Sequence, residues 1–134
     1  MSTIIRFFVA PDDDTAAAAR EHGPGKGADT VTFGNFDVYL ALEDWECILT
    51  GRDLGDVQGP DVLGDDGPMV LVVPSALTEA LAGDVTGVAA RWSELQADEG
   101  ETIDEELAAE IVAGVAALAV RARRIGSGLY CWWC

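Results

Sequence analysis

The sequence predicts a single α+β domain spanning residues 1–134, with a small mixed sheet and several packed helices. Three observations lead to this prediction: the expected strands are few and short, the expected helices take a larger share of the chain, and the two do not alternate strictly as a doubly wound sheet requires. With 134 residues, 49% of them apolar, the chain has the length of one ordinary domain and enough apolar residues to bury one core.

The N-terminal part of the chain predicts two strands with a short helix between them. Residues 3–10 form an apolar run of strand-forming residues, and the aspartates at 12–14 suit the positive end of a helix over the alanine-rich stretch 15–20. A glycine-rich loop at 23–27 follows, and 30–33 is the second expected strand. The loop does not match a phosphate-binding Walker loop, because the Ser or Thr after the lysine is missing and no helix begins there.

The middle of the chain predicts a helix, a loop and a strand. From Phe36 onward, apolar residues recur at spacings of three and four until Gly51, a residue that suits the left-handed conformation of a helix end. We expect this helix to bury Trp45. The polar stretch 52–68 is rich in Gly, Asp and Pro and is expected to be an exposed loop, whereas 69–73 is a compact apolar strand.

The next segment predicts two helices, the first introduced by Pro74 and Ser75, because apolar residues again recur at helical spacing. The residues that we expect these two helices to bury are Leu77, Leu81, Val85, Val88, Trp92 and Leu95.

The C-terminal part predicts a long helix and a final strand. Thr102 and Glu105 match a capping box, so the helix is expected to begin there; arginines occupy its last turn, and Gly126 ends it. Residues 129–133 form the strand. The expected inner face of the helix is Leu107, Ile111, Val115, Leu118, Ala122 and Ile125.

Charge limits the kinds of partner that the protein can bind. Eight Lys and Arg against 24 Asp and Glu give a formal net charge of −16, which repels the phosphates of nucleic acids and anionic lipids. We therefore expect no direct binding of nucleic acid or membrane. Such a surface suits a basic protein partner, and it can imitate a phosphate backbone. Solubility alone is the competing explanation.

The sequence also bears on location. The N-terminus has no basic segment before its short apolar run, as a signal peptide would, and nowhere do about eighteen apolar residues follow one another as in a membrane span. We expect a cytoplasmic protein. Its three cysteines are then expected to be thiols unless metal or catalysis recruits them.

Two segments carry a family resemblance. The stretch Leu40 to Gly51, LALEDWECILTG, resembles a motif of the YfbM-like family in which a tryptophan helix ends in an LLTG-type sequence. The long helix over 105–125, the small-residue turn after it and the apolar strand at the C-terminus are similar to the closing elements of that family. The resemblance covers about a quarter of the chain. It implies a single α+β domain without an assigned activity, and no catalytic residues carry over.

The chain ends in LYCWWC, whose Cys-x-x-Cys raises the question of redox or metal chemistry. In thiol oxidoreductases the first cysteine lies at a helix N-terminus, but no helix can follow here. In a strand, Cys131 and Trp133 face one side while Trp132 and Cys134 face the other, which is unsuited to a disulfide or a shared metal. We expect the segment to be a structural strand. The alternative is a zinc-binding or thiol-reactive protein that uses Cys131 and Cys134 with Cys47 and His22.

Other chemistry is less well supported. Asp12/Asp14, Glu43/Glu46 and Asp65/Asp66 are carboxylate pairs that suit a hard cation, but no EF-hand pattern is present and solvated charge also explains them. No Gly-x-Ser-x-Gly motif accompanies the single histidine, so serine-type catalysis is unsupported. An enzyme acting on a small molecule is a third hypothesis.

The leading hypothesis is a non-enzymatic interaction protein, of the immunity or antitoxin kind, that presents acidic loops to a basic protein surface and needs no cofactor. Exposed aromatic area on Trp132 or Trp133 is expected to supply an anchor. The acidic residues expected to form the interaction surface are Asp12, Asp13, Asp14, Asp61, Asp65, Asp66, Asp98, Glu99 and Glu101.

Overall fold

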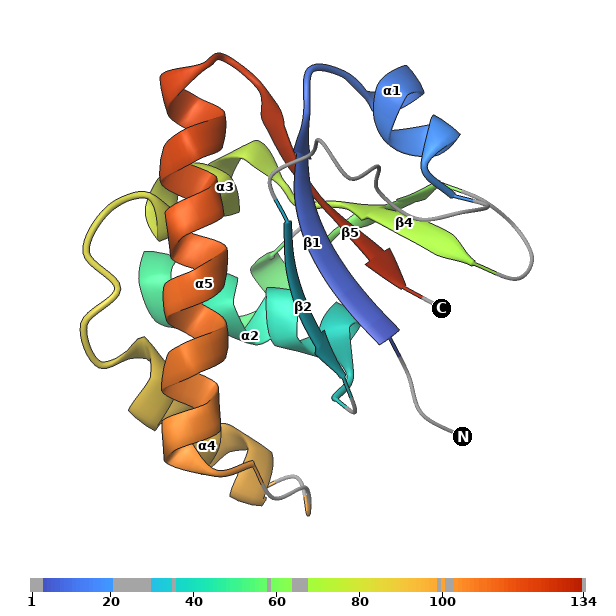
Figure 1. Cartoon of the computed structure of the whole chain (residues 1–134). Coiled ribbons are helices and arrows are strands. Elements are labelled where there is room, and N and C mark those ends of the chain that lie inside the picture. The colour runs from blue at the N-terminus through green and yellow to red at the C-terminus, as the bar shows by residue number, and fades with distance from the viewer. Residues whose placement is uncertain are drawn as a thin grey trace.

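An antiparallel sheet of five strands lies at the centre of the fold (Figure 1). The computed structural model describes residues 4–20, 30–34, 36–57, 59–63, 68–98, 100 and 103–133. Within these residues the strand order is β2-β1-β5-β4-β3, and each neighbouring pair is antiparallel. The α+β class is confirmed, although the sheet is antiparallel and not mixed. The strands are β1 (Ile4–Ala10), β2 (Thr30–Gly34), β3 (Asp61–Leu63), β4 (Met69–Val72) and β5 (Gly128–Trp133).

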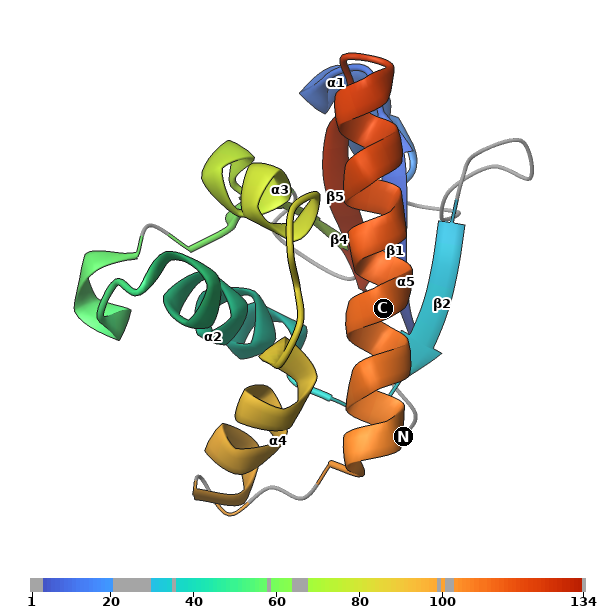
Figure 2. The same cartoon turned by 90° about the vertical axis from the view of Figure 1, so that its left-hand side faces the viewer.

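The helices divide unequally between the two faces of the sheet. Helices α2 to α5 share one hydrophobic core with one face, and α1 packs on the other (Figures 1 and 2). None of the helices in the described part of the chain is long and apolar enough to cross a membrane. The helices are α1 (Asp13–Ala18), α2 (Val38–Thr50), α3 (Ser75–Leu81), α4 (Val88–Asp98) and α5 (Glu105–Arg124), with a short 3-10 helix, η1 (Leu54–Asp56).

The larger core contains two tryptophans in contact. Trp45 of α2 and Trp92 of α4 are fully buried, with ring centroids 5.1 Å apart and planes at 81°, the edge-to-face arrangement that aromatic rings prefer. Phe7 of β1 lies against Trp45, with centroids 6.1 Å apart. The expected burial of Trp45 is confirmed, and these rings join α2 and α4 to the sheet.

The smaller core ties α1 and the residues after it to the opposite face. Tyr130 stacks on Phe8, with ring centroids 5.7 Å apart, and its hydroxyl donates a 2.8 Å hydrogen bond to Asp13 Oδ1. Trp132 donates from its indole Nε1 to the backbone carbonyl of Arg20, at 2.8 Å. Residues Leu129 to Trp133 of LYCWWC therefore belong to a central strand that is buried on both faces and supplies side chains to both cores.

Two local expectations, the loop over 52–68 and the N-cap of the long helix, were wrong. The stretch 52–68 contains η1 and β3. Strand β3 pairs with β4 although its Val62 is exposed, so it has only Leu63 as a burial signal. The N-cap of α5 is Asp104, whose carboxylate accepts from Glu106 N at 2.8 Å. An aspartate caps as well as a threonine does.

The inner face of α5 is shorter than expected. Its central positions, such as Ile111 and Val115, are buried against the sheet, but Leu107 is 43% exposed and Ile125 is 50% exposed. Leu107 lies in the first turn and Ile125 is the C-cap, so both lie at the ends of the helix, beyond its buried middle. Helix α1 also begins earlier than expected, at Asp13.

Candidate functional site

The three aspartates at the start of α1 have different roles. Asp12 is the N-cap of α1: its Oδ1 accepts from Thr15 N at 2.8 Å, and this bond lowers the pKa of Asp12 below its ordinary value. Asp13 accepts the hydrogen bond from Tyr130. Asp14 is exposed and makes no hydrogen bond or ion pair within the described part of the chain. Asp14 is therefore the member of the group that is free to face a partner.

The structure does not bring the proposed acidic residues together. Asp61 opens the edge strand β3 and Asp98 ends α4, and both are exposed. Helices α1 and α4 lie at opposite ends of the molecule in both views (Figures 1 and 2), so Asp14 and Asp98 are far apart. The remaining proposed residues lie outside the described residues: Asp65, Asp66, Glu99 and Glu101.

The aromatic anchor is corrected for one of its two candidates. Trp132 is only 8% exposed, because α1 and the segment up to Arg20 cover it, and the Arg6 guanidinium carbon lies 5.6 Å from its ring centroid. Trp133 is partly buried against the larger core. Trp132 is thus a core residue and offers no free surface, and the role of Trp133 stays a prediction.

The described cysteines do not resemble reactive thiols. Cys131 is fully buried on the helix-covered side of β5, and burial raises the pKa of its thiol far above the ordinary value. Cys47 in α2 is partly buried; burial and then the charge of Asp44 raise its pKa as well. A nucleophilic cysteine needs the opposite shift. Burial of Cys131 therefore gives the thiol-reactive alternative no support, and that alternative stays a prediction.

The zinc set is only half described, because His22 and Cys134 lie outside the described residues. As expected, Cys131 and Trp133 contribute to one core and Trp132 to the other. Among the residues that the structure does describe, no three His, Cys, Asp or Glu side chains are grouped to hold a metal ion. Zinc binding by the four-residue set stays a prediction.

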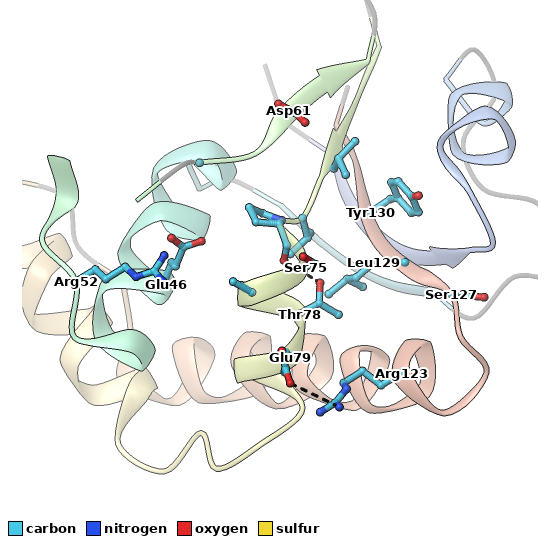
Figure 3. A pocket seen from close by; sticks show the side chains of 16 residues that line it. Glu46, Arg52, Asp61, Ser75, Thr78, Glu79, Arg123, Ser127, Leu129 and Tyr130 are labelled. Carbon is cyan, nitrogen blue, oxygen red and sulfur yellow. Dashed lines mark hydrogen bonds and ion pairs between the residues drawn. The ribbon is translucent and has the colours of Figure 1, made fainter. Parts of the chain in front are cut away.

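A cavity of about 620 Å³ lies where α2, the start of α3, the end of α5 and the start of β5 meet (Figure 3). Val73 and Leu129 form part of its apolar wall. Its rim is charged: Asp61 and Arg52 are exposed there, and Glu79 Oε1 forms an exposed ion pair with Arg123 Nη2 at 3.7 Å. This volume falls within the range of small-molecule sites, which is roughly 300–1,000 Å³.

Glu46 is the unusual member of the cavity wall. Its side chain lines the cavity and is 2% exposed, yet within the described residues its carboxylate forms no hydrogen bond and no ion pair. A buried charge ordinarily has a partner, because removal from water is costly. The carboxylate can therefore serve as the counter-ion of a bound cation.

The sequence analysis named Glu46 only as half of a carboxylate pair with Glu43, and not as a buried residue of a cavity, although the sequence contains a signal for the latter. Leu42, Trp45 and Leu49 mark the buried stripe of α2 by their helical spacing, and position 46 falls within the same stripe. An acidic residue at an apolar position of a helix indicates either a buried partner or a functional site. The cavity itself carried no such signal, because segments far apart in the sequence form it.

Comparison of the chain with protein-family models, with curated proteins and with solved structures finds no match. The resemblance to the YfbM-like family therefore stays a prediction from the two quoted segments.

Proposed function

We propose that this chain is a cytoplasmic, non-enzymatic interaction protein of the immunity or antitoxin kind, which binds a basic surface of another protein. One observation carries the proposal. Even if all eight Lys and Arg were paired, sixteen of the 24 acidic side chains would keep their charge. An excess of this size gives a field that accelerates the approach of a basic partner.

The distribution of this charge refines the proposal. Two of the described and exposed acidic groups, those of Asp14 in α1 and Asp98 at the end of α4, belong to helices at opposite ends of the molecule. A partner that covers one face of the molecule contacts one of them at most. Association should therefore respond to both charges through the long-range field, but dissociation should respond to only one.

Affinity capture from the host with tagged protein tests the proposal. Three baits are compared: wild type, Asp14→Lys and Asp98→Lys. Neither aspartate makes a hydrogen bond or ion pair within the described residues, so both variants should fold. We expect the wild-type bait to retain a basic protein. One of the two variants should lose this protein and the other should keep it. The basic protein, once purified, should also bind purified wild type directly.

The two variants control each other because each changes the net charge by the same amount. Retention of one partner by all three baits, or capture of partners without an excess of Lys and Arg on their surface, would contradict the proposal.

A further inference from the structure

We propose that the cavity lined by Glu46 is a binding site for a guanidinium or ammonium group, with the Glu46 carboxylate as its counter-ion. This proposal does not depend on the proposed basic protein partner, because binding of a small cation to the purified protein is enough to test it. It rests on two separate observations: the cavity itself, and a buried carboxylate in its wall that has no partner within the described residues.

The position of Glu46 explains why the ligand should be cationic. Glu46 as a whole residue is 2% exposed, and no guanidinium of the described residues pairs with its carboxylate, although Arg52 lies near it on the rim (Figure 3). A carboxylate within a recess of the protein attracts an opposite charge more strongly than a carboxylate surrounded by bulk water does. A guanidinium can in addition donate two parallel hydrogen bonds to a carboxylate, which favours it over a simple point charge.

The rest of the cavity suits the stem of such a ligand. Val73 and Leu129 offer apolar surface in the same cavity, and Ser75 and Ser127 are among the polar residues that line it. Arg123 is already paired with Glu79 on the exposed rim, so the positive charge of Arg123 repels a cationic ligand only weakly. The expected ligand is thus an alkyl chain that ends in a guanidinium or ammonium group.

An NMR titration of uniformly ¹⁵N-labelled protein with n-butylguanidinium tests the site. We expect saturable shifts at the amides of cavity residues such as Ser75 and Leu129. Because a charge-assisted pair is lost, n-butylurea, which has nearly the same shape without the charge, should bind at least about tenfold more weakly to wild type.

Glu46→Gln is the decisive variant. It keeps the size of the side chain and breaks no hydrogen bond or ion pair of the described residues, so its melting temperature and its spectrum should match wild type. It should lose about tenfold or more in affinity for n-butylguanidinium. Glu110→Gln removes the same charge from an exposed position of α5 outside the cavity and should bind as wild type does.

Two further arms complete the experiment. Arg52→Gln should bind the probe at least as tightly as wild type, because a neighbouring positive charge is removed. A short peptide with blocked ends and a central arginine shows whether the natural ligand is a partner's side chain or a free small molecule. Binding of the peptide as tight as that of n-butylguanidinium assigns the site to a partner's side chain. Much weaker binding of the peptide assigns the site to a free ligand.

Equal binding of n-butylguanidinium to wild type and Glu46→Gln, or the absence of saturable shifts in the cavity, would overturn the proposal. Either result would leave the basic-partner proposal standing, because that proposal is tested at Asp14 and Asp98. Failure of the basic-partner proposal would not change the expected result of the n-butylguanidinium titration.

Discussion

At the scale of single residues, side chains that the sequence marks as surface acids also hold the fold together. Asp12 caps α1, and Asp13 accepts the bond from Tyr130 that fastens α1 to β5. Gly128 makes room for this contact: a Cβ there would lie 3.1 Å from the Tyr130 hydroxyl. The acidic residues at the start of α1 therefore combine charge with structure, and among these three aspartates only Asp14 can be altered without loss of a bond within the described residues.

Tyr130→Phe should lower the free energy of unfolding by about 1 kcal/mol, because it removes one hydrogen bond and keeps the ring. Urea denaturation followed by tryptophan fluorescence measures the change. The other tyrosine provides the control: Tyr39 is exposed and makes no hydrogen bond within the described residues, so Tyr39→Phe should change stability little. Equal effects of the two substitutions would contradict the contact with Asp13.

Asp12 should make stability depend on pH. Its pKa is lowered in the folded protein by the bond from Thr15, so its contribution is complete above the ordinary aspartate pKa of about 3.9 and is lost as pH falls through the lower folded value. Thermal unfolding of wild type and Asp12→Asn over this range measures it. Wild type should lose stability relative to the variant on acidification. A difference that does not change with pH would argue against the cap.

At the scale of elements, backbone conformation sets where α2 ends and burial defines β5. Gly51 is the C-cap of α2, with φ of 74°, and its amide donates to Cys47 O at 2.9 Å. Strand β5 pairs with β1 along one edge and with β4 along the other. Its side chains are buried in the larger core on one face and in the smaller core on the other. Chemistry at Cys131 would require this central strand to open.

Gly51→Ala should destabilise the protein by about 1 kcal/mol, because an L-residue is strained at positive φ. Gly55→Ala is the matched control: a Cβ at either position meets open space, but the φ of Gly55 lies outside the positive region. Chemical denaturation of both variants separates strain from packing. A loss as large at Gly55 as at Gly51 would contradict the left-handed end of α2.

Cys131 should resist labelling by a thiol reagent in the native protein. In a variant that keeps Cys131 as its one cysteine, with Cys47→Ala and Cys134→Ser, we expect labelling at the rate of unfolding, because the thiol is fully buried and its pKa is raised. A variant that keeps only Cys47, which is partly exposed, should react faster. Rapid labelling of Cys131 in the native protein would contradict its burial and support the thiol-reactive alternative.

At the scale of the whole molecule, the sequence predicted those parts of the fold that bury side chains with regular spacing. Strand β1, helix α2 around Trp45 and the buried middle of α5 all follow apolar periodicity. Strand β3 escaped prediction because it is only three residues long and two of them, Asp61 and Val62, are exposed.

The candidate site was predictable only in part for the same reason. The position of Glu46 within an apolar stripe was visible in the sequence, but the cavity in front of it depends on the meeting of α2, α3, α5 and β5. Trp132 could not be placed because the cover over it comes from α1 and Arg20, more than a hundred residues away in the chain.

The association rate of the wild-type protein with its captured partner, measured across ionic strength, tests whether the excess negative charge serves recognition. If the net charge of −16 serves recognition, the rate constant should fall at least about tenfold between about 20 mM and 300 mM salt, because screening removes the long-range attraction. A rate that stays constant over this range would mean that the charge serves solubility and that the partner is recognised by other means.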